Sequence, residues 1–227
     1  MKNYLFILLI CLGCASKKEI VVPKFESKIV SNEKLSCRAI FVDTDKVWLG
    51  MDKGRYGFYD KKKDTLVVKT IQSVSNTTEF RSIAATKDAI FILAVGNPAK
   101  LIKIDKKSLQ ETIVYQEENE KVFYDSMQFV DNLNGFAMGD PTEDCLSFIK
   151  TTDGGNSWEK VSCANFPKVS EGEAAFATSN TNLIVTGKSI FMVSGGKKSR
   201  VFVSHDFGTS WLVYETPIVQ GEEMTGI

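Results

Sequence analysis

The sequence contains few of the residues that metal and redox sites require. His205 is the only histidine, and among the five cysteines a C-x-x-C pair occurs only at Cys11 and Cys14, in the apolar N-terminus. There is no dinucleotide-binding G-x-G-x-x-G in a βαβ pattern and no haem signature. We therefore expect no metal and no cofactor, and an oxidoreductase is the least favoured function.

The sequence also lacks an excess of charge of either sign. Its 28 Lys and Arg residues balance 28 Asp and Glu residues, and removal of Lys2 with a leader leaves 27 − 28, a net charge of −1. Proteins that bind nucleic acids neutralise phosphates with clustered basic residues. A nucleic-acid partner is therefore not expected.

No apolar run is long enough to span a membrane as a helix. The longest candidate, residues 4–12, has nine residues, whereas about 20 are needed to cross the hydrocarbon core. Lys2 precedes this run and Gly13-Cys14 follows it, which is the pattern of a secretory leader. We expect a signal peptide over residues 1–13 and an exported protein.

The end of this leader, Cys11-Leu12-Gly13-Cys14, resembles a bacterial lipobox in which Cys11 replaces the usual leucine. The resemblance implies that Cys14 is diacylated and becomes the first residue of the mature chain. The polar stretch 14–34 then serves as a flexible tether. The protein would be lipid-anchored to a bacterial membrane and face the periplasm or the cell surface. The alternative is ordinary secretory cleavage beside an incidental cysteine.

Sustained helical periodicity is absent, and short strands recur instead. Units of four short strands begin at Arg38, Arg81, Asp125 and Glu173, at intervals of 43, 44 and 48 residues. Four strands with a period of about 40–50 residues are typical of a propeller blade. We predict an all-β β-propeller over residues 35–227, with blades at about 36–72, 79–117, 122–164 and 172–216. In the fourth unit, residues 173–177 are the predicted first strand and 182–187 the second.

One short motif, T/S-x-D-x-G-x-S-W, occurs at residues 151–158 and again at 204–211. Each copy lies between apolar runs, which predicts a hairpin tip. The Asp can accept hydrogen bonds inside its own turn, the Gly supplies a positive φ, and the Trp covers the turn. The residues concerned are Asp153, Gly155 and Trp158 in the first copy and Asp206, Gly208 and Trp211 in the second.

These motifs resemble the Asp-box, or bacterial neuraminidase repeat, of β-propellers. Residues 36–227 as a whole resemble photosystem II stability/assembly factor-like propellers, some of which are bacterial lipoproteins. The resemblance implies that the boxes lie at blade edges away from the binding face. It also implies a binding or assembly role at a membrane. We interpret the two aspartates as structural rather than catalytic or metal-binding.

The cysteines beyond the leader are Cys37, Cys145 and Cys163. The midpoint of 145 and 163 is residue 154, the centre of the first motif, so these two cysteines should face each other across the hairpin. In an exported protein they can form a disulfide; two reduced, buried cysteines are the alternative. Cys37 has no obvious partner.

The end of the chain, residues 221–227, resembles residues 172–176. This predicts the first strand of a fifth blade. Two outcomes fit: a piece of a longer product with six or seven blades, which we favour, or an open arc that oligomerises to cover its apolar flanks.

Innermost strands line the channel of a propeller, so the charged residues that open them form a candidate binding site at the channel mouth. The alternative is ordinary solvated charge. Turn residues Asp140, Glu143 and Asp144 form a weaker candidate set. The channel-mouth residues are Arg38, Arg81, Asp125, Glu173 and Glu223.

The favoured function is a membrane-anchored scaffold that binds a protein or glycan partner. The alternative is a sialidase-like glycoside hydrolase, in which Glu173 and Asp125 would be the carboxylate pair. The resemblance to sialidases implies three arginines around the substrate, a Tyr–Glu nucleophile pair and an acid Asp. The sequence has only four arginines, of which Arg38 and Arg81 open first strands. A non-enzymatic scaffold is therefore preferred.

Overall fold

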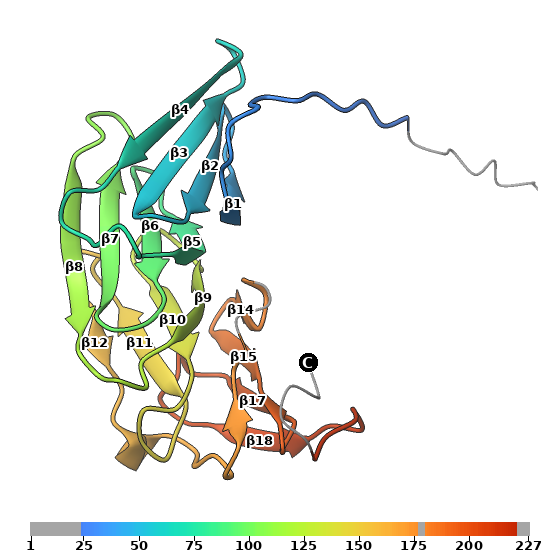
Figure 1. The fold of residues 1–227 in the computed structure, drawn as a ribbon. Helices are drawn as coiled ribbons and strands as arrows, with labels where there is room; N and C mark the ends of the chain where they lie inside the picture. Colours follow the sequence, from blue (N-terminus) through green and yellow to red (C-terminus); the bar gives the residue numbers. More distant parts are fainter. Residues whose placement is uncertain (1–23, 177–179, 222–227) are drawn as a thin grey trace, which may run out of the picture.

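The computed structural model describes residues 24–176 and 180–221. The predicted leader (1–13), Cys14, the tether up to residue 23 and Glu223 lie outside the described residues, as does nearly all of the strand predicted at 221–227. The described part of the tether contains no strand, and its Lys28 forms an ion pair with Asp64 before the chain extends beyond blade one (Figure 1). Within the described ranges, no helix has the length and apolar character needed to cross a bilayer.

The first two blades are antiparallel sheets whose strands lie in sequence order, from the channel outward. Alternating apolar residues produce these strands, because successive side chains point to opposite faces of a sheet. Blade one consists of β1 (Cys37–Val42), β2 (Lys46–Met51), β3 (Arg55–Asp60) and β4 (Thr65–Thr70). Blade two consists of β5 (Phe80–Ala85), β6 (Ala89–Ala94), β7 (Ala99–Asp105) and β8 (Glu111–Glu117).

Blade three repeats this order and ends in a short outer strand. The 3-10 helix η1 (Cys163–Asn165) follows, and Cys145 and Cys163 form a disulfide with their Cα atoms 5.5 Å apart. The disulfide joins the segment before the third strand to the segment after the fourth. The strands of blade three are β9 (Tyr124–Phe129), β10 (Gly135–Gly139), β11 (Ser147–Thr151) and β12 (Glu159–Lys160).

Blade four differs from the prediction. Its innermost strand is the predicted second strand, and the next strand, at 189–193, was not predicted. Glu173 belongs instead to a separate two-stranded ribbon, in which it pairs with Gly196. The blade consists of β14 (Leu183–Thr186), β15 (Ser189–Val193), β17 (Arg200–Ser204) and β18 (Leu212–Glu215); the ribbon consists of β13 (Glu173–Ala174) and β16 (Gly195–Gly196).

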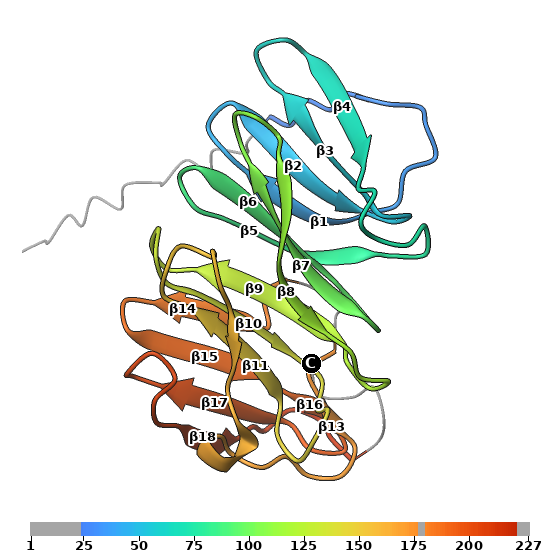
Figure 2. The same ribbon diagram turned by 90° about the vertical axis from the view of Figure 1, so that its left-hand side faces the viewer.

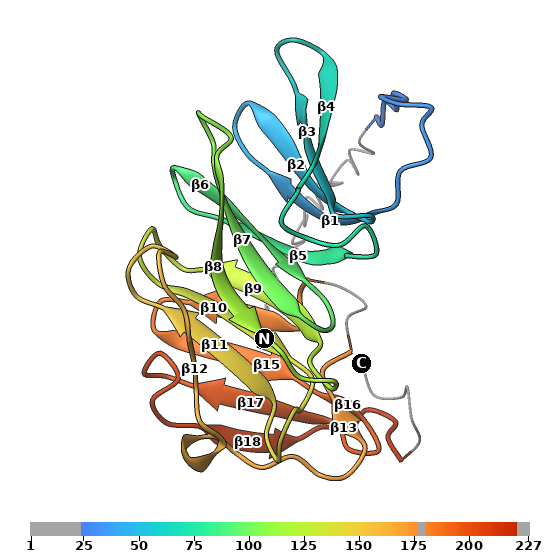
Figure 3. The ribbon, with the colours of Figure 1, turned by 60° about the vertical axis from the view of Figure 1, so that its left-hand side comes forward.

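The four blades follow one another as an arc, with the inner strands β1, β5, β9 and β14 on its concave side (Figures 1 and 3). Apolar residues on facing blade surfaces form three separate cores. In each core, one buried aromatic residue from the second strand of the earlier blade packs toward the next blade. These are Trp48, Phe91 and Phe136, each no more than 1% exposed.

An aspartate at the end of the third strand holds the outer hairpin in every blade. The Asp60 and Asp105 carboxylates each accept hydrogen bonds from the two residues at positions +2 and +3. Asp153 and Asp206 accept from the backbone N–H groups at +3 and +4 and from the serine hydroxyl at +4. Local side-chain to backbone hydrogen bonds of this kind fix a turn without help from the rest of the fold.

The two motif turns contain glycines at φ of 75° and 77°, Gly155 and Gly208. A Cβ at Gly155 would lie 2.3 Å from the Phe91 ring, so this position requires glycine for space as well as for φ. Trp158 packs edge-on against Phe129, and Trp211 packs edge-on against Phe148. The motif turns therefore anchor the outer edges of blades three and four.

Candidate functional site

The three charged residues that open β1, β5 and β9 occupy one repeated backbone irregularity. In β1, Cys37 pairs with Met51 and Ala39 with Gly50, so that Arg38 is an extra residue. Arg81 and Asp125 are the extra residues of β5 and β9 in the same register. A β-bulge redirects the side chain of the inserted residue. The three positions are thus structurally equivalent in successive blades.

The environments of these three residues differ. Arg38 is exposed. The guanidinium of Arg81 donates to the Glu79 carboxylate at 3.0 and 3.1 Å and lies over the Phe123 ring. Asp125 is 1% exposed, and neither of its carboxylate oxygens makes a hydrogen bond within the described part of the chain. Burial therefore increases along the series, from the exposed Arg38 through the half-buried Arg81 to the buried Asp125.

Burial, and after it the nearby Asp140 carboxylate, raises the pKa of Asp125 to about 9 against the opposing positive charge of Arg81. Burial also raises the pKa of Asp140, against the opposing effect of backbone N–H donors including that of Ala175. The structure thus brings Arg81 and Asp125 within electrostatic range, as the sequence suggested, and adds Asp140 to them. At neutral pH, Asp125 is protonated.

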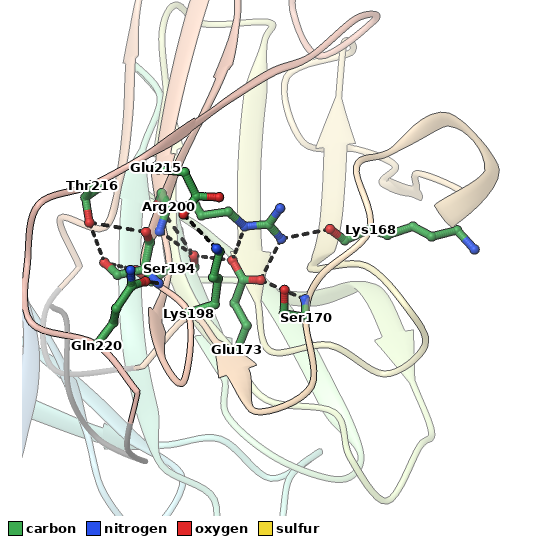
Figure 4. Close-up of polar contacts among 10 residues, drawn as sticks. Lys168, Ser170, Glu173, Ser194, Lys198, Arg200, Glu215, Thr216 and Gln220 are labelled. Atoms are coloured by element: carbon green, nitrogen blue, oxygen red, sulfur yellow. Dashed lines mark hydrogen bonds and ion pairs between the residues drawn. The ribbon is translucent and has the colours of Figure 1, made fainter.

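Glu173, by contrast, does not open an innermost strand. It is 3% exposed and forms a two-point ion pair with Arg200, with Nε–Oε1 at 2.9 Å and Nη2–Oε2 at 2.6 Å. The Ser194 hydroxyl and the Ser170 backbone N–H also donate to its carboxylate (Figure 4). A carboxylate with its acceptor sites engaged in this way holds the β13–β16 ribbon against β17. Its placement at the channel mouth was wrong because the fourth blade begins ten residues later.

Two adjoining hollows lie beside the last residues of β1, β5 and β9 and the first residues of β14. One, of about 360 Å³, is lined by the inner strands of all four blades, including Ala84, Met127 and Leu183. The other, of about 550 Å³, is lined by the turns that follow β1, β5 and β9. Phe41, Ala85 and Phe129 line both. We refer to the two together as the channel groove.

Two amide side chains connect the blades beside this groove. The Asn180 Oδ1 accepts from the Ser82 hydroxyl and the Met127 N–H, and its Nδ2 donates to the Ile83 carbonyl, all at 3.0–3.1 Å. Gln128 binds both the N–H and the carbonyl of Val185. In each case a carboxamide takes the place of a peptide group at the free edge of an inner strand. The inner-strand edges on the concave side therefore bind amide groups readily.

The rim of the channel groove carries both signs of charge. Asp43 and Lys106 form an ion pair at 2.7 Å, and Lys87 and Asp131 also line the rim. The Lys87 N–H donates to the Asn132 side chain. Residues 24–176 and 180–221 contain no cluster of three or more His, Cys, Asp or Glu side chains arranged to hold a metal ion. The groove is therefore apolar at its floor and mixed in charge at its rim.

Sequence reasoning did not identify the groove, because its floor consists of ordinary apolar strand residues. Phe41, Ala85 and Phe129 show the same alternation as the core. Their place at the ends of three consecutive inner strands is the only sequence signal that distinguishes them. This signal can be recognised only after the register of the repeats along the sequence is known.

No protein-family model and no curated protein matches this chain. Among solved structures, U3-55K matches with a TM-score of 0.62 and 12% identity over 83% of this chain. The Swd1 β-propeller domain of Myceliophteria thermophila matches with a TM-score of 0.54 and 10% identity over 82% of it. The chain is a β-propeller. At these identities the likeness shows the fold alone.

This propeller chain spans about half the length of the proteins that it matches, 54% of U3-55K and 57% of the Swd1 domain. YCF48 bound to D1 peptide also matches, with a TM-score of 0.46 and 11% identity, over 81% of this chain and 69% of that chain.

Proposed function

We propose that this propeller is a binding or assembly scaffold, and that it holds a segment of a partner protein in the channel groove. The observation that carries the proposal is the groove itself, which the inner strands of four blades line together. Ligand sites are concave and mostly apolar, with a few polar groups that fix orientation. The channel groove has this composition.

An extended protein segment suits the groove better than a nucleic acid or a small anion. The rim combines Lys87 and Lys106 with Asp43 and Asp131, so it offers no basic surface for phosphates. The apolar floor suits side chains, and the inner-strand edges beside it already bind a carboxamide group, that of Asn180, at Met127 and Ile83. Main-chain hydrogen bonds with side-chain pockets are a recurrent mode of peptide recognition.

The sialidase-like alternative gains no support from the two carboxylates assigned to it. Asp125 and Glu173 are 1% and 3% exposed, and Glu173 is committed to Arg200. A glycosidase pair must reach a sugar from both sides of the scissile bond. We therefore expect no turnover of 4-methylumbelliferyl glycosides, sialosides included.

Site-specific photocrosslinking of the full chain in cells tests the groove. A benzoylphenylalanine probe replaces Thr44 or Lys87, exposed rim residues from blades one and two, and control probes replace Thr65 on β4 and Arg38 at the opposite mouth. We expect one partner to be captured by both rim probes and by neither control. Capture at Arg38 alone would move the site to the other mouth. Equal capture at Thr65, or capture by none of the probes, would contradict the proposal.

We further propose that the scaffold is exported and lipid-anchored through Cys14, which lies outside the described residues. The support is the lipobox-like sequence that ends the apolar leader. In a bacterial host, Cys14→Ser should move the protein from the detergent-dependent membrane fraction to the soluble exported fraction. The Cys37→Ser variant is the matched control and should stay with the membrane. An unchanged membrane fraction for Cys14→Ser would reject the anchor.

A further inference from the structure

One side chain beside the channel groove binds a backbone residue of the next blade through both of its polar atoms. The Gln128 Oε1 accepts a hydrogen bond from the Val185 N–H at 2.7 Å, and its Nε2 donates to the Val185 carbonyl at 3.3 Å. A carboxamide offers a donor and an acceptor side by side, whereas a carboxylate has no donor and an ammonium group has no acceptor. The contact therefore suits an amide side chain and neither of these charged groups.

The register of the strands places Ala84 where Gln128 stands one blade later. Gln128 pairs with Phe136, the buried aromatic residue in the second strand of blade three. Ala84 pairs with Phe91, the corresponding aromatic residue of blade two. The methyl group of Ala84 has no donor or acceptor, so blade two does not make the same contact with the blade that follows it.

Phe129 is the residue that an amide side chain at position 84 would reach. It directly follows Gln128 in β9. Val185 directly follows the equivalent residue of β14, Ile184, so Phe129 and Val185 are register equivalents in successive blades.

The N–H and C=O of Phe129 point to the free edge of β9. The next residue, Val130, donates its N–H to the Asn134 carbonyl within the blade. Residues in an antiparallel ladder alternate between bonding their partner strand and pointing away from it. Two residues earlier on the same edge, the Met127 N–H binds the Asn180 side chain. Among the described residues no side chain binds the Phe129 N–H or C=O, so these two groups remain for a ligand.

Open space lies beside both Ala84 and Phe129. The part of the channel groove with a volume of about 360 Å³ is lined by these two residues, and also by Gln128 and Asn180. A side chain that a partner places there meets the Ala84 methyl group and the Phe129 backbone edge together. The groove thus combines an unbound donor and acceptor with room for the group that fits them.

We propose that the channel groove recognises a glutamine or asparagine side chain of the partner segment, whose carboxamide binds the Phe129 N–H and C=O. This inference rests on the proposed function, because it requires the groove to hold a segment of a protein. The bound carboxamide lies over Ala84 and reproduces, one blade earlier, the contact of Gln128 with Val185. An aspartate or glutamate side chain cannot donate to the Phe129 carbonyl, and a lysine side chain cannot accept from its N–H.

Proton–nitrogen NMR of the isotope-labelled full chain in a mild detergent tests this contact. The probes are N-acetylglutamine N-methylamide and N-acetylmethionine N-methylamide, which share a backbone and a similar side-chain length and differ in the carboxamide. We expect capped glutamine at millimolar concentration to shift the Phe129 amide signal saturably and capped methionine to leave it in place. Equal shifts would show that the probe backbone binds instead, and the absence of a shift would show that no carboxamide binds there. Either result would overturn the inference.

Gln128→Ala supplies a positive control in the same measurement. The substitution frees the Val185 N–H and C=O, so capped glutamine should shift the Val185 amide signal in this variant and leave it unchanged in the wild type. A shift at Val185 in the variant without a shift at Phe129 in the wild type would overturn the assignment of the site to Phe129.

Ala84→Gln tests the contact from within the chain. Its carboxamide should bind Phe129, so the Phe129 signal should shift without a probe compound. Capture of the partner by the benzoylphenylalanine probe at Lys87 should fall roughly tenfold, because the partner loses two hydrogen bonds. Thr65→Gln, on the outer strand β4, is the matched control and should leave capture unchanged.

The outcomes separate this inference from the scaffold proposal. Undiminished capture by an Ala84→Gln variant whose Phe129 signal has shifted would overturn the inference and leave the scaffold proposal intact. An unshifted Phe129 signal in a folded Ala84→Gln variant would overturn the inference as well, because the register equivalence would not hold. Absence of capture by the Lys87 probe in the chain without Ala84→Gln would contradict the scaffold proposal itself.

Discussion

The inner strand on the concave side of the arc begins differently in blades one to three and in blade four. In blades one to three, the inner strand opens with a bulge that carries a charged residue: Arg38, Arg81 or Asp125. In blade four, a two-stranded ribbon precedes the inner strand, and the buried Glu173–Arg200 pair attaches this ribbon to the blade. The outer hairpins, by contrast, are held by an aspartate in all four blades.

The outer hairpins are alike in all four blades because contacts within each turn hold them. The channel side, in contrast, differs between blades. A charge at a bulge remains available to a partner in blade one and becomes progressively buried in blades two and three. In blade four the corresponding charge is replaced by an ion pair. Polar groups near the channel thus differ in burial: Arg38 is exposed, whereas Glu173 is buried and attaches the ribbon to the blade.

The largest expected effect concerns the attachment in blade four. Glu173→Gln leaves the Arg200 guanidinium, whose side chain is 13% exposed, without its counter-charge. Loss of one partner of a buried pair costs about 3 kcal/mol or more. Thermal unfolding should show a decrease in melting temperature of roughly 6–12 °C.

The matched control is Glu79→Gln, which breaks the ion pair of Arg81 in blade two, where the side chains are 26% and 36% exposed. Such a pair contributes at most about 1 kcal/mol. An equal decrease in melting temperature for the two variants would contradict the prediction. The Glu173–Arg200 pair would then contribute no more to stability than the partly exposed Glu79–Arg81 pair.

The second effect is the pH dependence contributed by Asp125. Its folded pKa of about 9 lies above its unfolded value, so folding favours the protonated form. Stability from this group is fully present below about pH 4 and is lost progressively as pH rises toward 9. Asp125→Asn should therefore be more stable than the wild type at pH 8 and similar to it at pH 4, as measured by urea unfolding.

Asp88→Asn, at an exposed turn between β5 and β6, removes a charge without removing a buried carboxyl. Its stability should parallel that of the wild type across the pH range. If the Asp125→Asn and wild-type profiles were also parallel, Asp125 would be ionised in the folded protein. The series of increasing burial from Arg38 to Asp125 would then need another explanation.

The smallest effect is expected at the outer hairpins that the blades share. Ser157 donates to Asp153 through its hydroxyl and its backbone N–H, and these bonds lower the pKa of Asp153 to about 2 despite the opposing effect of burial. A lowered pKa stabilises the fold above about pH 4, and the effect is lost as pH falls through 2. Asp153→Asn should lower the free energy of unfolding by about 1 kcal/mol at pH 7.

The deficit of Asp153→Asn should shrink as the pH approaches 2, where the wild-type carboxylate is also protonated. Asp60→Asn, in the corresponding turn of blade one, should also lower the free energy of unfolding. Thermal unfolding of both variants measures these changes. A stabilised Asp60→Asn variant would show that the aspartate turns of blades one and three are not equivalent.

Much of the fold could be read from short segments of sequence. The first strands of blades one to three begin one residue before the predicted starts Arg38, Arg81 and Asp125, because alternating apolar residues define a half-buried strand locally. The equivalence of Arg38, Arg81 and Asp125 was visible as a repeat interval. The turn aspartates were also predictable, since their partners lie within four residues of them.

The same local reasoning was wrong at the start of blade four. Residues 173–177 resemble a strand that opens a blade, but nothing local distinguishes an inner strand from a ribbon. The pairing of Glu173 with Arg200, 27 positions later, decides the outcome. Residues 189–193 then become the second strand of the blade, between β14 and β17.

The sequence by itself therefore determined the strand period, the register of the bulges and the chemistry of the outer turns, because these depend on neighbours along the chain. Only the tertiary structure decided which charges are buried and where the channel groove lies. These properties arise where segments more than 40 residues apart meet, as Phe41, Ala85 and Phe129 do. The burial of a charged residue and the concave shape of the groove therefore cannot be deduced from any single segment.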